Sequence, residues 1–131
     1  MAHSYTVKVY YEDTDAGGVV YYANYLRFME RARTEYLREH GVDVSELHNM
    51  GTFLVVTHMD VTYRRPARLG ETLHVTSKLL ETKAVKATLR QQVLREGELL
   101  VDVLLSFACI NREGKPLRLP PAFEALAAAE A

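Results

Sequence analysis

One segment of the chain has the period of an amphipathic helix. From about Tyr22 to His40, apolar residues recur at three- and four-residue spacing, and charged residues lie largely between them. The apolar positions are Tyr25, Phe28, Met29, Ala32, Tyr36 and Leu37. A helix of about 19 residues is roughly 28 Å long, so it would cross a whole domain of this size. Gly41 stands where a left-handed C-terminal cap is expected.

The segments on either side of this helix alternate between apolar and polar residues, which predicts strands. One strand is predicted over Ser4–Tyr11, and four more lie between Phe53 and Ile110. In the first of these four strands, one face is predicted to carry Phe53, Val55, Met59, Val61 and Tyr63. The last strand, Leu99–Ile110, is almost continuously apolar, as in a central strand that is covered on both faces.

The order of these segments, one strand, a long helix and then four strands, predicts an α+β domain. In that domain the long central helix packs on a curved, five-stranded antiparallel sheet. A short helix is predicted over Asp43–Leu47, with Gly51 ending it, and Pro120–Ala131 is predicted to be an Ala-rich helix or a frayed tail. The 131 residues suit a single domain spanning residues 1–131.

Charge and composition argue against several classes of protein. The chain has 16 basic and 17 acidic residues, so it lacks the general signature of a nucleic-acid-binding or membrane-coating protein. No apolar run is long enough to cross a bilayer, and the N-terminus does not resemble a signal peptide, so a cytoplasmic protein is expected. The single cysteine, Cys109, excludes a disulfide within the chain and fits a reducing compartment.

The loop between the first strand and the long helix, Tyr11–Tyr22, carries the residues best suited to chemistry. Gly17 and Gly18 have no Cβ, so a ligand can approach the backbone closely. The free N–H groups at the start of the following helix favour negative charge in the same region. The loop could therefore place a carboxylate beside oxyanion donors, the minimum for acyl transfer. On spacing alone, a structural role for Asp13 and Asp15 in the chain reversal is the commoner explanation.

Other chemistries have weaker support in the sequence. A calcium loop that starts at Asp13 is rejected, because its twelfth position is Asn24, where a bidentate Glu is needed. The five histidines have no metal-ligand spacing, so no metal site is expected. Cys109 shares the apolar phase of its strand, which predicts a buried, inert thiol. The glycine patterns of serine-hydrolase elbows, P-loops and dinucleotide-binding folds are absent.

A long stretch of the chain, residues 9–37, resembles the signature of the 4-hydroxybenzoyl-CoA thioesterase family, which has the hot-dog fold. Its sequence is VYYEDTDAGGVVYYANYLRFMERARTEYL. The likeness is closest to the YbgC-like acyl-CoA thioesterase branch, whose active-site motif matches Thr14–Tyr21. Residues 63–71, YRRPARLGE, resemble the family's second landmark, a turn between strands. One departure is Tyr22, where related sequences often carry His, so an acid–base role at this position is lost.

The resemblance implies an acyl-CoA thioesterase that hydrolyses acyl-CoA to a free carboxylic acid and CoA. Asp15 would attack the thioester as a nucleophile, or act as a general base for water, with Asp13 only its neighbour. Backbone amides near the start of the helix would polarise the thioester carbonyl. The substrate-binding residues implied in this loop are Gly18, Val19, Tyr21 and Tyr22.

Further expectations concern cofactors and partners. Arg64 and Arg65, which cluster with Arg68 near one turn, either contact the phosphates of coenzyme A or form a solvated loop. No metal or tightly held cofactor is needed, since water is the second substrate and CoA is part of the first. The family resemblance implies a homo-oligomer, a dimer or more often a tetramer, with the site built between protomers.

Two other functions stay open at this stage. One is different thioester chemistry on the same fold, as in a dehydratase or a thioesterase acting on acyl carrier protein, although the loop lacks the His that a hydratase usually uses. The other is a non-catalytic acyl-thioester-binding protein, or a cell-envelope-associated interaction protein, of the same fold. Substitution of Asp15 separates these functions, because a protein that only binds should tolerate it.

Overall fold

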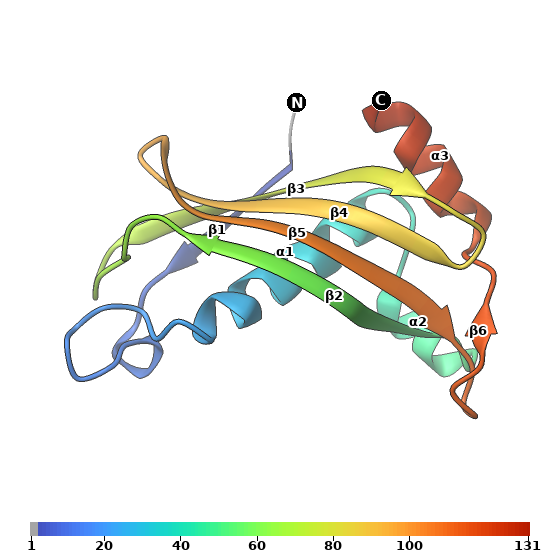
Figure 1. The fold of residues 1–131 in the computed structure, drawn as a ribbon, viewed down its shortest axis with the longest axis horizontal. Coiled ribbons are helices and arrows are strands. Elements are labelled where there is room, and N and C mark those ends of the chain that lie inside the picture. The colour runs from blue at the N-terminus through green and yellow to red at the C-terminus, as the bar shows by residue number, and fades with distance from the viewer. Residues whose placement is uncertain (1–2) are drawn as a thin grey trace.

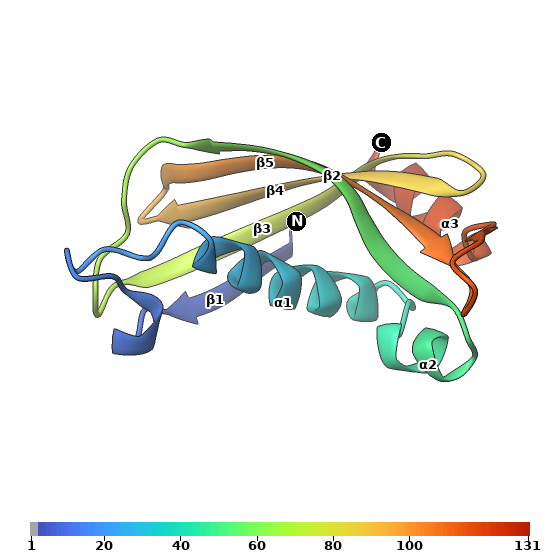
Figure 2. The ribbon, with the colours of Figure 1, turned by 60° about the horizontal axis from the view of Figure 1, so that its bottom comes forward.

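In the described part of the chain, an antiparallel sheet of six strands forms one layer, and helix α1 crosses one face of it (Figures 1 and 2). The computed structural model describes residues 3–131, so the first two residues of the predicted domain lie outside the described range. The strands are β1 (His3–Lys8), β2 (Phe53–Tyr63), β3 (Thr72–Thr82), β4 (Lys86–Arg95), β5 (Glu98–Ile110) and β6 (Pro116–Leu117). Their order in the sheet is β1-β3-β4-β5-β2, and the short β6, which adds a sixth strand to the five predicted, pairs with β5.

Within residues 3–131, three α-helices and one short 3-10 turn complete the fold. They are η1 (Tyr11–Asp13), α1 (Asn24–Glu39), α2 (Val44–Asn49) and α3 (Pro121–Glu130). Helix α1 has 16 residues and starts later than predicted, because a turn precedes it in which the Asn24 N–H donates to the Tyr21 carbonyl. Its end is the predicted one, since Gly41 has a φ of +85° and the Val42 N–H donates back to the Leu37 carbonyl.

The core lies between α1 and the inner face of the sheet. The buried residues of α1 are the six that the periodicity predicts, Tyr25, Phe28, Met29, Ala32, Tyr36 and Leu37. They pack in one cluster with apolar residues of the central strands, among them Val75, Leu89, Val103 and Leu105. Helix α3 adds Phe123, whose ring lies 5.7 Å from that of Phe107. The α+β class and the packing of one helix across a sheet are therefore confirmed.

The predicted face of β2 is wrong in its first half. A bulge interrupts the pairing of β2 with β5 between Val56 and His58. Before the bulge, Leu54 lies opposite the buried Cys109, and after it Met59 lies opposite the buried Leu105. Opposed residues of an antiparallel pair share a face. The bulge therefore moves Phe53 and Val55 to the outer face, which simple alternation cannot reveal.

Strand β5 is covered on one face only, which corrects the prediction for this strand. Val103 and Leu105 are buried against the helix layer, whereas Leu104 between them is 45% exposed. Asp102 on the same outer face pairs with Arg90 of β4, with Arg90 Nη2 2.8 Å from Asp102 Oδ2. At the end of the sheet lies β2, which pairs with β5 and, within residues 3–131, with no other strand. One long edge of the sheet is therefore open.

Candidate active site

Asp15 stands at the tip of a tight hairpin between η1 and α1. Thr14 and Val20 form an antiparallel bridge at its base. Across the turn, the Asp15 N–H donates to the Val19 carbonyl at 2.9 Å, and the Gly18 N–H donates to the Asp15 carbonyl at 3.0 Å. Gly18 has a φ of +78°, which L side chains rarely adopt. The backbone thus fixes Asp15 in an exposed position.

One oxygen of the Asp15 carboxylate is held and the other is available. Oδ1 accepts the Gly17 N–H at 2.8 Å. Within residues 3–131, Oδ2 has no hydrogen-bond partner in the protein. A Cβ at position 17 would lie 3.3 Å from Oδ1, so the absence of a side chain there keeps the carboxylate uncrowded. The arrangement presents one carboxylate oxygen to a ligand in a defined orientation.

Asp13 is a structural residue, in keeping with the neighbouring role expected from the sequence. Its side chain is buried, with Oδ2 accepting the Tyr10 N–H and Oδ1 accepting an Asn24 Nδ2 hydrogen, each at 2.8 Å. Its carbonyl accepts the Tyr21 N–H at 3.0 Å. Both carboxylate oxygens are occupied, so Asp13 ties the loop to the first residue of α1 rather than facing a substrate.

Of the predicted backbone donors, only one is free. The Tyr21 and Gly18 N–H groups donate within the loop, to the Asp13 and Asp15 carbonyls. The Tyr22 N–H has no acceptor in the described part of the chain. Its peptide plane is fixed, because the Tyr21 carbonyl accepts the Asn24 N–H at 2.8 Å. The helix itself begins after Ala23, which provides no side-chain cap. The structure therefore leaves the Tyr22 amide as the candidate oxyanion donor.

A second loop, residues 64–71, packs beside this hairpin. The Val20 N–H donates to the Ala67 carbonyl at 2.8 Å. Arg95 holds the loop from below, since its Nη1 lies 2.9 Å from Glu71 Oε1 and 3.1 Å from the Pro66 carbonyl oxygen. Hydrogen bonds from the Arg68 N–H and Arg95 lower the pKa of Glu71 against the opposing effect of burial. Hydrogen bonds thus join the two loops to each other and join the second loop to Arg95 of β4.

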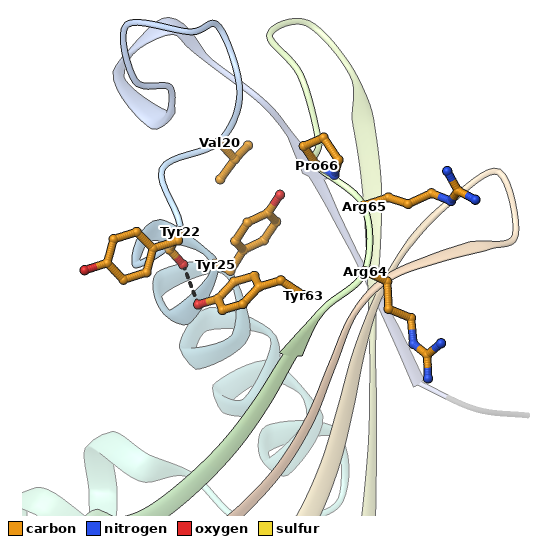
Figure 3. A pocket seen from close by; sticks show the side chains of 7 residues that line it. All are labelled: Val20, Tyr22, Tyr25, Tyr63, Arg64, Arg65 and Pro66. Carbon is orange, nitrogen blue, oxygen red and sulfur yellow. Dashed lines mark hydrogen bonds between the residues drawn. The ribbon is translucent and has the colours of Figure 1, made fainter.

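A cavity of about 260 Å³ lies between the two loops and the start of α1. Figure 3 shows its lining residues, Val20, Tyr22, Tyr25, Tyr63, Arg64, Arg65 and Pro66. The Tyr63 hydroxyl donates to the Tyr22 carbonyl oxygen at 2.9 Å, and the Tyr25 hydroxyl accepts the Ala67 N–H at 3.0 Å. Burial raises the pKa of both Tyr25 and Tyr63, so both phenols stay neutral. The cavity has aromatic walls and neutral hydrogen-bonding groups.

Asp15 lines a different hollow, of about 340 Å³. Tyr21, Ala23, Asn24 and Arg27 also line it, so the carboxylate and the start of α1 share one space. The structure therefore brings Asp15 beside the beginning of the helix, as predicted from the loop. It does not bring Asp15 into one cavity with Arg64 and Arg65, which line the first cavity.

The two arginines predicted to contact coenzyme A differ in their partners. Arg65 Nε lies 2.9 Å from Glu98 Oε2, an exposed ion pair. Arg64 is exposed and makes no ion pair within residues 3–131. In Figure 3 both guanidinium groups point away from the tyrosine rings. Arg64 is therefore the freer of the two for a phosphate ligand.

Several other residues that could carry chemistry are either buried or lie on the outer face of the sheet. Cys109 is fully buried, and burial raises the pKa of its thiol to about 11, which confirms an inert residue. His58 and His74 lie exposed on the outer face of the sheet. Across residues 3–131 no cluster of three His, Cys, Asp or Glu side chains could hold a metal ion. No helix in that range is both long and apolar enough to span a membrane.

Three residues of the site were not found from the sequence. They are Asn24, Tyr63 and Arg95. Tyr63 contacts Tyr22 across 41 residues of sequence, and Arg95 contacts Pro66 across 29 residues. Local periodicity carries no signal for such pairs. Tyr63 begins the motif of residues 63–71, but the motif does not show its contact with Tyr22, and Asn24 had a local signal as a polar residue in the first turn of a helix.

Comparison with known proteins finds a matching family, similar sequences and a similar structure. A family model described as the thioesterase-like superfamily matches residues 9–128. The acyl-CoA thioester hydrolase YbgC of Escherichia coli O157:H7 is 39% identical over 116 residues, covering 88% of this chain and 84% of the relative. The acyl-CoA thioesterase YbgC of Haemophilus influenzae is 39% identical over 119 residues, covering 89% and 88%. A crystal structure of a probable thioesterase from Bartonella henselae matches 92% of this chain and 100% of that one, with a TM-score of 0.87 and 37% identity.

Proposed function

Because the chain belongs to the thioesterase-like superfamily, we propose that it is an acyl-CoA thioesterase, which hydrolyses acyl-CoA to a carboxylic acid and CoA. The observation that carries the proposal is the position of Asp15. Its carboxylate has one unoccupied oxygen and shares a hollow with the uncapped start of α1. A carboxylate beside unfilled backbone amides is the arrangement that hydrolysis of an activated acyl group requires.

In the proposed reaction the thioester carbonyl oxygen accepts the Tyr22 N–H. Asp15 acts in one of two ways. As a nucleophile, its free oxygen bonds to the carbonyl carbon, the C–S bond breaks, CoA leaves as a thiolate that is then protonated, and water hydrolyses the anhydride. As a general base, it takes a proton from the water that attacks the carbon; the C–S bond then breaks, and CoA leaves as a thiolate that is protonated. The Tyr22 amide stabilises the oxyanion in both routes, and a donor of this type contributes roughly 2.7–4 kcal/mol.

Substrate binding in this proposal uses the surfaces around Tyr22. The loop residues Gly18, Val19 and Tyr21 shape the entrance, although the Gly18 and Tyr21 amides are occupied within the protein. Arg64 and Arg65 lie toward the phosphates of coenzyme A, and the exposed guanidinium groups support this placement. No metal or tightly held cofactor takes part, since coenzyme A belongs to the substrate and water is the second reactant. We place this reaction in the cytoplasm.

We further infer that the working enzyme is a homo-oligomer. The support is the open edge of β2, a strand of 11 residues at the end of the sheet. An exposed strand edge of this length favours pairing with another strand. A second copy paired through β2 gives a dimer, and two dimers give the tetramer expected from the family resemblance. Tyr63 is the last residue of β2, so the partner would lie beside the tyrosine-lined cavity.

The experiment that tests the proposal is CoA release from a panel of short, long and aromatic acyl-CoAs. The unaltered protein is compared with Asp15→Asn, which keeps the side-chain size and removes the carboxylate. We expect turnover of at least one substrate and a loss of at least about a hundredfold in kcat for Asp15→Asn. Asp43→Asn is the matched control, because Asn caps a helix as well as Asp does and Asp43 is remote from Asp15.

Three other outcomes have distinct meanings. If Asp15→Asn releases CoA as fast as the unaltered protein, the fold stands and the assigned residue is wrong. If neither protein releases CoA from any member of the panel but both bind acyl-CoA, the protein is a non-catalytic acyl-thioester-binding module. If Asp43→Asn loses as much activity as Asp15→Asn, the losses come from folding, which circular dichroism and the melting temperature then show.

A further inference from the structure

Asn24, the first residue of α1, carries a side-chain amide whose orientation is fixed by its partner. Its Nδ2 donates to Asp13 Oδ1 at 2.8 Å. An ionised carboxylate accepts hydrogen bonds and donates none, so the NH2 end of the amide must face Asp13. The backbone of Asn24 is held as well, since its N–H donates to the Tyr21 carbonyl at 2.8 Å. The carbonyl end of the side chain, Oδ1, therefore faces away from Asp13.

Asn24 Oδ1 has no partner inside the protein. Within residues 3–131, no group donates a hydrogen bond to it. In the same range, the only buried side-chain polar atom that lacks a hydrogen bond is His3 Nδ1. Asn24 Oδ1 is therefore in contact with solvent, although the residue as a whole is half-buried. This oxygen can accept a hydrogen bond from a ligand or from a water molecule.

A second oriented amide shows the contrast with a purely structural role. Gln91 of β4 is fully buried, and its Nε2 donates to the Met29 carbonyl at 2.9 Å and to Ser77 Oγ at 3.0 Å. Its Oε1 accepts from Arg33 Nη1 at 3.0 Å. Both ends of the Gln91 amide thus have partners within the protein. The amide of Asn24 is held at one end only.

Asn24 lines the hollow of Asp15, which has a volume of about 340 Å³. Each of the two side chains is anchored at one end, Asp15 by the Gly17 N–H and Asn24 by Asp13, and each keeps one oxygen free. A water molecule has two hydrogens and can donate one to each of these oxygens. The lone pairs of that water then remain available for the carbon of a thioester whose oxygen accepts the Tyr22 N–H.

The other groups that line this hollow are less suited to hold such a water. They are Glu12, Thr14, Tyr21, Ala23 and Arg27. The Arg27 guanidinium only donates, and the Thr14 hydroxyl uses its hydrogen on the Tyr11 carbonyl at 2.8 Å. Glu12 is exposed and, in the described part of the chain, makes no hydrogen bond or ion pair that would orient its carboxylate. Because water is neutral, the charges of Glu12 and Arg27 do not decide whether it binds.

We propose that Asn24 Oδ1 and Asp15 Oδ2 together hold the water that attacks the thioester, and that Asp13 orients Asn24 for this task. The inference rests on the proposed hydrolysis of acyl-CoA and assigns the general-base route to it. The water oxygen bonds to the carbonyl carbon while one water hydrogen passes to Asp15. The C–S bond then breaks, the proton on Asp15 passes to the CoA thiolate, and the second water hydrogen stays on the carboxylic acid. Asn24 is thus a catalytic residue, and Asp13 is a positioning residue.

The sharpest test is Asp13→Asn, which should turn the Asn24 amide around without changing the shape of either side chain. The Tyr10 N–H, which lies 2.8 Å from Asp13 Oδ2, can only donate. The new amide at position 13 must therefore place its oxygen toward Tyr10 and its NH2 toward Asn24. Asn24 then offers its own oxygen to that NH2 and presents a donor to the hollow, where the water needs an acceptor.

Steady-state kinetics with the best acyl-CoA compares Asp13→Asn and Asn24→Ala with the unaltered protein. We expect kcat to fall about fivefold or more in each variant with little change in KM, the effect of losing one hydrogen bond in the transition state. The double variant should be no slower than Asn24→Ala, because both changes remove the same acceptor. Asn49→Ala, which alters an exposed asparagine at the end of α2, is the matched control and keeps its kcat.

Hydroxylamine separates a role in holding water from a purely structural role. It is a stronger nucleophile than water, so its attack on the thioester, which yields an acyl hydroxamate, depends less on two acceptors. In Asp13→Asn and Asn24→Ala we expect hydrolysis to fall more than hydroxamate formation, so that the ratio of hydroxamate to acid rises severalfold. Loss of the oxyanion donor or of the loop structure would lower both reactions equally, and that result would overturn the inference.

Other results also overturn the inference and leave the proposed function standing. One is an inactive Asp15→Asn beside an Asn24→Ala that turns over at full rate, since Asn24 then takes no part. Another is full activity of Asp13→Asn while Asn24→Ala is slow, which contradicts the orientation of the amide. If Glu12→Gln raises the hydroxamate ratio and Asn24→Ala does not, Glu12 holds the water. Heavy oxygen found in Asp15 after a single turnover in labelled water would show a covalent acyl intermediate.

Failure of the proposed function has a different result. If the unaltered protein hydrolyses no acyl-CoA, the proposed function fails, and the inference fails with it. Circular dichroism shows whether each variant folds. If Asn24→Ala does not fold, Asp13→Asn decides, because it keeps a partner for every hydrogen bond of the two side chains.

Discussion

Helices α1 and α2 begin in opposite ways. At α2, the Asp43 carboxylate accepts the N–H groups of Ser45 and Glu46, at 2.9 and 3.2 Å. At α1, the corresponding residue is Ala23, which has no side-chain cap and whose backbone is already helical, with φ −75° and ψ −19°. The short helix thus has its first amides filled by the protein. The long helix leaves amides unfilled at the place where Asp15 lies.

The start of α1 is held from its sides instead. Asp13 accepts a hydrogen bond from the Asn24 side chain, and Tyr63 donates one to the Tyr22 carbonyl. These bonds fix the position of the helix start without occupying the Tyr22 amide. Helix α2, by contrast, has no buried residue, and its first amides are occupied by the Asp43 carboxylate. The difference shows how a stable helix can keep unfilled donors for a ligand.

Among changes at the two helix starts, we expect Ala23→Asp to have the largest effect on activity. Ala23 lines the hollow of Asp15, so a carboxylate there repels both the developing oxyanion and the charged substrate. We expect kcat/KM for the best acyl-CoA to fall by about tenfold or more. Ala23→Asn, measured in the same assay, has the same shape without the charge and should lose much less. Equal losses in the two variants would show that shape, and not charge, matters at this position.

The next effect concerns the lateral support of the helix start. Tyr63→Phe removes only the hydroxyl that donates to the Tyr22 carbonyl. One such hydrogen bond contributes about 1 kcal/mol, so we expect kcat to fall about fivefold with little change in KM. Steady-state kinetics with one good substrate measures the split. A rise in KM at constant kcat would assign Tyr63 to substrate binding instead.

The smallest effect on activity is expected at the other helix. Asp43→Ala removes the cap of α2 and should lower the free energy of unfolding by about 1 kcal/mol. Turnover of acyl-CoA should stay unchanged, because α2 is remote from Asp15. Urea denaturation followed by circular dichroism gives the first quantity, and the CoA-release assay gives the second. A loss of turnover in the folded variant would mean that the two helix starts are coupled.

The sequence predicted those elements whose signals are local. The periodicity of α1 named its six buried residues, Gly41 marked its end, and Asp43 marked the start of α2. The hot-dog fold, implied by the resemblance, is confirmed by the structure and its neighbours. Asp15 was found through the same resemblance, and its catalytic role stays a prediction.

What the sequence missed depends on contacts between distant segments. Which amides of residues 11–22 remain free depends on the Asp13 carbonyl accepting the Tyr21 N–H, and no pattern in the loop shows this. The bulge in β2 shifts the alternation of inward- and outward-facing residues by one position. Pairing with β5, and not the sequence pattern of β2 alone, decides which side chains face the core. Arg33 lies in a helix with many charged residues. Its hydrogen bond to Gln91, 58 residues away in the sequence, sets it apart from the exposed arginines of the helix and has no local signal.

The buried amide of Gln91 also bears on how this protein could diverge. Its Nε2 donates to the Met29 carbonyl at 2.9 Å and its Oε1 accepts from Arg33 at 3.0 Å, so one side chain joins β4 to two residues of α1. A change to Gln91→Glu would form an ion pair with Arg33, but it would also set an acceptor against the Met29 carbonyl, which is itself an acceptor. An apolar residue there would leave both polar groups of α1 without this partner. The packing of the helix on the sheet therefore limits which residues this position of β4 can accept as related proteins diverge.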